Sequence, residues 1–420
     1  MPRFAPFDAL RYAPGTDLQA VIAPPYDVLS DDDINRLKAL DGHNITHIDV
    51  PAGGDLSLGP AQAADDGEDP YRRADRLLRQ WLADGVLVRD GAPSYTVYRM
   101  SFTDATGAAR EITGVLGGLE VVDEGAGGVL PHERTTPKAV TDRLDLTRAT
   151  AANLSPVWGL SLANGLTAAL AAPGEPVGEM TAEGVVHRVE RIADPARIAE
   201  ITAVLAADDV LIADGHHRYA ISRTYRDEVR AATSRRDTEA EYTLAFVNEL
   251  KADQLSIEAI HRLYSGICLG HLRGVLAECF DFAPLDGAPT PATLREMSQA
   301  GRLVLLYLND DGGLEAEWMT PKPAAFDGLR ALDGAYLEHA LEPVEREPHG
   351  SNLAVSYQHG LDEMLAAVRS GQVTAGVLIR PTSLAEIERT AREGLLMPPK
   401  STFFTPKLRT GFVIRPTARL

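Results

Sequence analysis

A short apolar run that ends abruptly in polar residues constrains the fold of this chain more than any other feature. Residues 210–213 read VLIA and are followed by DGHHR at 214–218, after which a helical pattern begins. Consecutive apolar residues are typical of a buried strand, and a glycine directly after them permits a tight turn. The pattern predicts a strand, a turn and a helix, with polar side chains gathered at the carboxyl end of the strand.

Three interpretations of DGHHR remain open at this level. Backbone amides at the start of a helix attract anions, and histidine and arginine add donors there, which predicts a phosphate-binding site. A metal site is a rival, although His216 and His217 are adjacent on a helix and do not share a face. A plain helix cap formed by Asp214 is the third. The residues of the predicted site are Asp214, Gly215, His216, His217 and Arg218.

The composition disfavours nucleic acid and a membrane as partners. Asp and Glu number 60 against 41 Lys and Arg, a formal charge of −19, and no basic run stands out. Duplex binding gains its affinity from cations placed against phosphates, whereas a small anion needs only a few. No apolar run approaches the ~20 residues of a membrane span. Two cysteines suit a reducing compartment. We therefore expect a cytoplasmic protein with a small-molecule partner, and the oligomeric state stays open.

A second polar cluster, PHERTTPK at 131–138, follows a Gly/Pro-framed loop of the kind that often carries catalytic residues. A glutamate near cations can act as general base for a hydroxyl, while threonine, lysine and arginine hold phosphate oxygens. The alternative is a solvated loop whose charges pair with one another. The candidates are Glu133 as the base, and Thr135, Lys138 and Arg143 at the phosphate.

Smaller motifs add candidates for binding a substrate. The prolines of PPYD (24–27) fix an extended segment, which directs Tyr26 and Asp27 either into a pocket or against the core. HNITHIDVP (43–51) predicts a strand that places His47 and Asp49 on one face. Asn153, in ANLSP, is expected at a helix end or in a turn.

Strands interleaved with helices along the chain predict a mixed α/β (α+β) fold. SYTVYRMSFT and REITGVLGGLEVV are expected to form a hairpin around DATG (104–107). We expect residues 1–265 to form the phosphate-binding and catalytic region. Residues 266–420 form a second α/β region, whose MPPKSTFFTPK (397–407) either tethers the C-terminus or closes over the site. No P-loop, protein-kinase or Rossmann motif occurs.

Six segments in order, APPYDVLS, NITHIDVP, PHERTTPKAVTDRLDL, ANLSPVWGL, IADGHHRYA and MPPKSTFFTPK, resemble the bacterial family catalogued as a domain of unknown function, number 1015. The resemblance covers almost the whole chain. That family is related to the ParB-like superfamily, in which a strand–turn–helix with a G-x-x-R box binds nucleotide phosphates. The resemblance therefore implies a ParB-like core, with the box at 215–218.

The resemblance also implies an activity. ParB-like free-serine kinases carry a similar DGHHR, which implies a kinase that converts L-serine to O-phospho-L-serine with pyrophosphate, ADP or ATP as donor and Mg²⁺. Residues 214–218 would then hold the donor phosphates, completed by Thr135 and Lys138, and Asp214 would position the loop or the Mg²⁺ ion. Glu133 matches the base that activates the serine hydroxyl. The residues assigned to the substrate are Tyr26, Asp27, His132 and Asn153.

Two other functions remain as alternatives. One is a non-catalytic ParB-like regulatory module, which binds a nucleotide at 215–218 and changes conformation or partner without turnover. The other is a metal-dependent hydrolase that uses His132, His216 and His217 as ligands.

Overall fold

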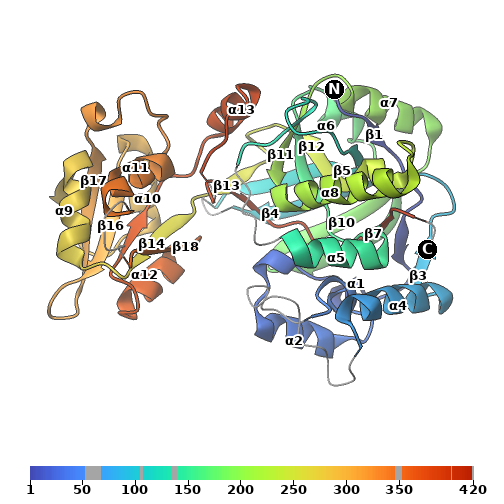
Figure 1. Cartoon of the computed structure of the whole chain (residues 1–420), viewed down its shortest axis with the longest axis horizontal. Helices are drawn as coiled ribbons and strands as arrows, with labels where there is room; N and C mark the ends of the chain where they lie inside the picture. Colours follow the sequence, from blue (N-terminus) through green and yellow to red (C-terminus); the bar gives the residue numbers. More distant parts are fainter. Residues whose placement is uncertain (53–67, 105–106, 134–139, 346–351, 399, 419–420) are drawn as a thin grey trace. The chain divides into compact units, whose positions relative to one another are not determined.

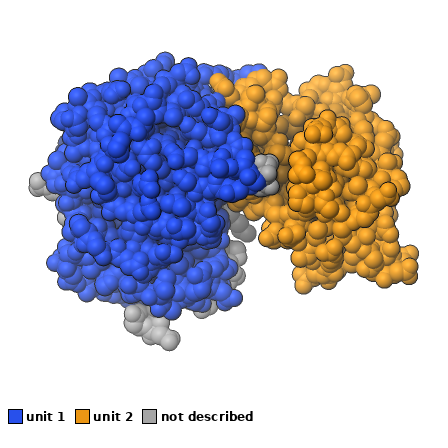
Figure 2. All heavy atoms as spheres, turned by 180° about the vertical axis from the view of Figure 1, so that it is seen from behind, with its two compact units in different colours: residues 1–256, 391–395, 406–420 blue, residues 257–390, 396–405 orange. Residues whose placement is uncertain are grey.

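A computed structural model describes residues 1–420 except 53–67, 105–106, 134–139, 346–351, 399 and 419–420. The chain forms two compact units, coloured separately in Figure 2. Unit 1 comprises Met1–Ser256, Ala391–Leu395 and Pro406–Leu420, and unit 2 comprises Ile257–Thr390 and Leu396–Thr405. The division thus falls after Ser256, where the sequence suggested residue 265, and the last residues of the chain return to unit 1.

Unit 1 is built on a nine-stranded mixed sheet (Figure 1). Most neighbours in it are antiparallel, but the first and second strands of the order are parallel, as are the third and fourth. The order is β6 (Val129–Leu130), β11 (Val210–Asp214), β8 (Val157–Ser161), β12 (Tyr242–Glu249), β5 (Ala109–Glu120), β4 (Tyr95–Thr103), β10 (Val185–Ile192) and β9 (Glu175–Ala182), with β1 (Phe4–Ala5) pairing β5. The predicted mixed α/β fold is confirmed.

Helices pack against this sheet, and α5 contacts both α4 and α8 (Figure 1). The apolar face of α4 is buried at Ala74, Leu78 and Trp81. The helices of unit 1 are α1 (Leu18–Val21), α2 (Asp31–Leu40), α3 (Thr46–Asp49), α4 (Pro70–Ala83), α5 (Val140–Thr150), α6 (Leu166–Ala169), α7 (Pro195–Leu205) and α8 (His216–Thr233). No helix in the described parts of the chain is long and apolar enough to cross a membrane.

Unit 2 has its own six-stranded antiparallel sheet with separate apolar clusters. The strand order is β15 (Phe280–Pro284), β17 (Leu314–Pro321), β16 (Leu303–Leu308), β19 (Ala375–Leu378), β14 (His261–Ser265) and β18 (Ala354–Gln358). Its helices are α9 (Leu269–Cys279), α10 (Pro291–Ala300), α11 (Asp333–Glu345), α12 (Leu361–Arg369) and most of α13 (Leu384–Arg392). Each unit therefore buries a core of its own.

Two local predictions have opposite outcomes. The hairpin is confirmed, since β4 and β5 pair antiparallel from Thr103 and Ala109 inward. The strand predicted at HNITHID is wrong, because Thr46–Asp49 forms the short helix α3. The Asn44 side-chain oxygen accepts the backbone N–H of Thr46 at 3.1 Å and its hydroxyl at 2.7 Å. Asparagine often stabilises such a turn through its own side chain, and here this overrides the strand pattern.

Close packing between β5 and β12 leads to a test of the fold. A Cβ added at Gly114 would lie 2.7 Å from the backbone oxygen of Val247 and would also meet the Phe246 ring. We expect Gly114→Ala to lower the free energy of unfolding of unit 1 by about 1–3 kcal/mol, measured by urea denaturation. Gly42→Ala is the control, because the space around Gly42 is open. Equal stability of the two variants would contradict this packing.

Candidate anion-binding site

Two polar motifs that are far apart in the sequence meet at one edge of the unit 1 sheet. β6 and β11 pair in parallel, with Val129 opposite Val210, so the residues after both strands lie at the same edge. The His132 and His216 rings stand edge to face with centroids 4.7 Å apart. The backbone N–H of His132 points to Nε2 of His216 at 3.5 Å. The segment that carries Glu133 thus lies beside the start of α8.

The predicted strand, turn and helix are confirmed. β11 ends at Asp214, Gly215 follows with φ of 85°, and α8 begins at His216. Glycine suits this left-handed conformation, which strains other residues. Among the described residues no side chain caps α8, and Asp214 instead accepts the N–H of Gly215 at 2.8 Å. The interpretation of Asp214 as a helix cap is therefore wrong, and the positive end of α8 has no carboxylate cap.

Arg218 is a buried cation held by three segments. Its Nη1 donates to the backbone oxygen of Pro156, and its Nη2 lies 3.4 Å from Asp27 and 3.6 Å from Asp214. Burial disfavours the charged form, but these carboxylates outweigh it and raise the pKa of Arg218. Its buried Nε makes no hydrogen bond with the described residues. The guanidinium therefore has a donor to spare.

Arg218 and Arg143 line one pocket with about 430 Å³ of empty space, part of which is open to solvent. Both guanidiniums lie over the Tyr26 ring, with Arg143 at 4.3 Å and Arg218 at 5.9 Å from its centroid, an arrangement that holds the aromatic ring in place. Four of the predicted site residues thus line one pocket although they come from four segments of the chain: Tyr26, Arg143, Asn153 and Arg218. The other lining residues are Asp49, Leu146, Thr147, Ala152, Asn153, Leu154, Ser155, Ile221, Ser222 and Thr243.

Asp49 is an acid of this pocket that the sequence did not assign to it. It is 3% exposed, its Oδ1 lies 3.3 Å from Arg143 Nη1, and Ser155 Oγ donates to it at 3.4 Å. Burial raises the pKa of Asp49 in spite of the nearby Arg143 and Arg218. The position of Asp49 in the pocket can be predicted only if α3 is recognised as a helix, because a strand would direct the Asp49 side chain elsewhere.

Asp214 is ionised and already engaged. Its Oδ1 accepts Gly215 N–H and its Oδ2 accepts Lys407 Nζ at 3.1 Å. Burial would raise the pKa of Asp214, but Lys407 and Arg218 outweigh it and hold that pKa well below the usual range. Lys407 belongs to unit 1 and comes from the C-terminal segment that returns to it. The suggestion that this segment tethers the C-terminus agrees with this ion pair.

The described residues contain no group of three or more His, Cys, Asp or Glu side chains arranged to hold a metal ion. Mg²⁺, however, usually needs only one or two carboxylates, because phosphate oxygens and water complete its shell. Asp27 and Asp214 flank Arg218 at 3.4 and 3.6 Å, so two carboxylates lie beside this guanidinium.

Two histidines of the site are neutral: His132, which is buried, and His216, which is half-buried. Nδ1 of His132 donates to the Ile212 carbonyl at 2.7 Å, and burial lowers the pKa of His132 to about 4. Burial, followed by the neighbouring His132, lowers the pKa of His216 well below its ordinary value. Because Nε2 of His216 accepts a bond, its proton lies on Nδ1. These two histidines therefore add no positive charge to the site.

The remaining predicted residues are placed as follows. Thr135 and Lys138 lie outside the described residues. Glu133 is half-buried directly after His132, and His217 is half-buried in the first turn of α8. Asn153 lies in the strand β7 (Ala152–Asn153), paired with β21 (Arg415–Pro416), so its placement at a helix end or turn is wrong.

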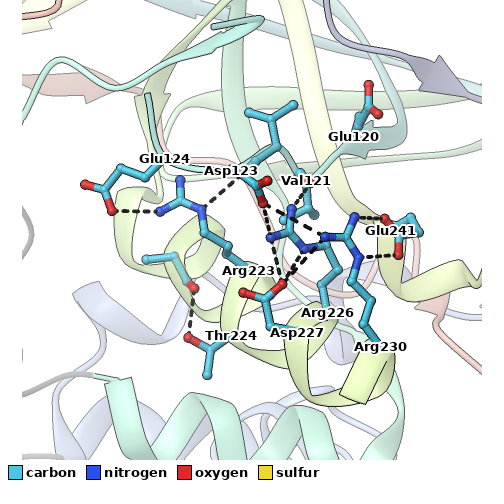
Figure 3. A network of polar contacts seen from close by, with 12 residues as sticks. Glu120, Val121, Asp123, Glu124, Arg223, Thr224, Arg226, Asp227, Arg230 and Glu241 are labelled. Carbon is cyan, nitrogen blue, oxygen red and sulfur yellow. Dashed lines mark hydrogen bonds and ion pairs between the residues drawn. The ribbon is translucent and has the colours of Figure 1, made fainter. Parts of the chain in front are cut away.

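Side chains of α8 hold the chain segment that leads to β6 (Figure 3). The Tyr219 hydroxyl bonds to Glu120 O and Val122 N, both at 2.9 Å, and Arg223 Nε donates to Val122 O at 3.1 Å. Arg226 donates to Val121 O and pairs with Asp123. One helix therefore carries DGHHR at its start and, through residues 120–123, fixes the strand that delivers Glu133.

The fold and the site define a mixed α/β protein with a pocket beside helix α8 that two arginines line. The chain belongs to the family described as "Protein of unknown function (DUF1015)", which matches residues 4–335, and the resemblance seen in the sequence is confirmed. Among curated proteins no sequence matches.

Several solved structures show a distant likeness. A free serine kinase in complex with AMP is 11% identical, with a TM-score of 0.37, over 66% of this chain and 84% of the other. A conserved hypothetical protein from Pyrococcus furiosus is 11% identical, with a TM-score of 0.36, over 66% and 87%. C-terminally truncated SbnI from Staphylococcus aureus is 13% identical, with a TM-score of 0.36, over 70% and 84%. These similarities are too low to assign a function.

Burial of neutral His132 predicts a pH-dependent stability. The folded pKa, about 4, lies below the ordinary 6.5, so the unfolded chain binds the proton more readily between these values. The contribution of His132 to the free energy of unfolding is therefore fully present above pH 6.5. It is lost as the pH falls toward about 4, by about 1.4 kcal/mol per pH unit. We expect His132→Gln to reduce this slope for unit 1 in urea denaturation. The exposed His43→Gln is the control, and equal slopes would contradict the assignment.

Proposed function

We propose that this protein is a small-molecule kinase that phosphorylates the hydroxyl of L-serine, with pyrophosphate, ADP or ATP as donor. The observation that carries the proposal is that Arg143 and Arg218 line one pocket, which runs beside the first two turns of α8 at Arg218, Ile221 and Ser222. Serine as acceptor rests on the likeness of DGHHR to the motif of ParB-like free-serine kinases. The donor is left open among the three.

Phosphoryl transfer asks a protein mainly to position the reactants and to neutralise charge, because little covalent chemistry falls to the protein itself. Arg218 offers an Nε–H that has no partner among the described residues, and the first turn of α8 offers its dipole. Arg143 supplies a second planar fork, which matches phosphate oxygens better than an ammonium does. In this proposal residues 214–218, with Thr135 and Lys138, hold the donor. Mg²⁺, when bound, neutralises the phosphate oxygens further.

In this proposal Glu133 acts as the general base. It follows β6 by three residues and is next to His132, whose ring contacts His216 at the start of α8. A serine bound there would have its hydroxyl near both the base and the donor. Glu133 takes the hydroxyl proton as serine Oγ attacks the terminal phosphorus, and the bond from phosphorus to the bridging oxygen breaks. Pyrophosphate leaves as orthophosphate, ADP as AMP, and ATP as ADP. The carboxylate of Asp27 suits the serine ammonium, with Tyr26, His132 and Asn153 around the substrate.

The activity is tested by incubating the protein with L-serine, Mg²⁺ and each donor in turn, and by measuring O-phosphoserine. We expect product with at least one donor, and Glu133→Ala should lower kcat about 10²–10⁴-fold because the general base is lost, with little change in the KM of the donor. Glu124→Ala, an exposed acid of the preceding loop, is the matched control. Tight nucleotide binding without product from any donor would contradict the kinase and favour the regulatory module.

The role of the arginines is tested by replacements that keep the charge. Arg143→Lys and Arg218→Lys retain a cation but lose the planar fork, so we expect the Kd of pyrophosphate to rise about tenfold or more in titration calorimetry. Arg148→Lys is the control, since Arg148 lies on the same helix as Arg143 and its side chain is 46% exposed. Unchanged affinity in all three variants would contradict the assignment of the pocket to phosphate.

A further inference from the structure

Unit 1 contains a second pocket that shares no lining residue with the first and has about 730 Å³ of empty space, part of it open to solvent. The end of β2 (Leu10–Tyr12), the residues that follow it and the start of α1 form one wall, the edge strand β9 and its neighbour β10 form another, and Gly411 and Phe412 complete the lining. No feature of the proposed reaction uses this pocket.

Arg11 gives the pocket a buried cationic wall. Its side chain is 5% exposed, and its Nε and Nη2 each donate to Asp90 at 2.8 Å. Nη2 also donates to Thr96 at 2.6 Å, but the buried Nη1 makes no hydrogen bond with the described residues. A buried donor without a partner is costly, and an acceptor supplied by a ligand would remove that cost. A carboxylate is the acceptor that guanidinium binds best in a small organic molecule.

Asp17 gives the same pocket an acidic group. Its Oδ1 caps α1 by accepting the N–H of Gln19 at 3.0 Å, whereas its Oδ2 makes no hydrogen bond with the described residues. Glu179, which also lines the pocket, pairs with Arg188 outside it at 2.8 Å. Two acids in the lining disfavour a multiply charged phosphate and favour a ligand that carries a positive group as well.

We propose that this pocket binds a free α-amino acid as a second, separate ligand. Its carboxylate pairs with Arg11, its ammonium pairs with Asp17, and an apolar or small side chain packs against Val177, Val189 and Phe412. The charges of the ligand and of the two walls are then complementary, and both groups of the zwitterion find partners. The proposal stands on the charges of the pocket and is independent of the kinase activity.

The test uses a bulky residue on either face of the same sheet. Val177 is half-buried on edge strand β9 and lines the pocket, so Val177→Phe fills it. Val186→Phe is the matched control, because Val186 is half-buried and alternation along β10 places it on the opposite face from Val189. Both variants and the unchanged protein are titrated by calorimetry with each common amino acid, and with acetate and inorganic phosphate for comparison. We expect at least one amino acid to bind about tenfold or more weakly to Val177→Phe and with unchanged affinity to Val186→Phe. Equal affinity in both variants would overturn the proposal.

A second variant distinguishes an amino acid from a simple carboxylate and does not depend on filling the pocket. Asp17→Asn keeps a good N-cap but removes the charge. We expect it to weaken binding of the amino acid about fivefold or more and to leave acetate unchanged. Equal effects on both ligands, or binding of phosphate in place of amino acids, would overturn the zwitterion assignment. Arg143→Lys alters the first pocket and should leave the affinity for the amino acid unchanged. If Arg143→Lys abolishes binding of the amino acid, the ligand lies in the first pocket and the proposal is wrong.

Discussion

The buried guanidinium of Arg218 is the interaction on which the site depends. A charge taken out of water is stable only when it is paired and hydrogen-bonded, so this side chain requires Asp27, Asp214 and the Pro156 carbonyl to converge on it. These partners come from the PPYD turn, the end of β11 and the loop before β8. Nε has no hydrogen-bond partner among the described residues, and in our proposal a bound anion supplies one, so that the residue that assembles the site also binds the ligand.

The C-terminal segment completes the same assembly. After the chain has passed through unit 2 it returns to unit 1, where Lys407 pairs with Asp214, and the Thr410 and Ser155 hydroxyls bond at 2.8 Å. Arg415 then reaches Asn153 at 3.4 Å through the pairing of β21 with β7. The last residues of the chain thus contact Ser155 and Asn153 of the pocket, and in the sequence unit 2 lies between the residues that line the pocket and this C-terminal segment.

The sequence predicted those parts of the site that are encoded locally. The residues VLIA and DGHHR determine the strand, the turn and the start of the helix through interactions between neighbours in the sequence. The prolines of PPYD likewise fix the local backbone at Tyr26. Asp49 was missed because an Asn44 side-chain turn overrode an apparent strand pattern. Ser155 and the pairing of Lys407 with Asp214 were beyond reach, because they depend on contacts between residues hundreds of positions apart. Asp214 was expected to position the loop or an Mg²⁺ ion, and its pairing with Lys407 could not be predicted for the same reason.

A crystal structure of the protein grown with pyrophosphate and Mg²⁺ tests the central claim most directly. The account predicts electron density for a phosphate group within hydrogen-bonding distance of Arg143 or Arg218 and at the first backbone amides of α8, with the ion bound to phosphate oxygens and at most two carboxylates. An ordered pyrophosphate bound elsewhere on unit 1, with this pocket holding only water, would contradict it.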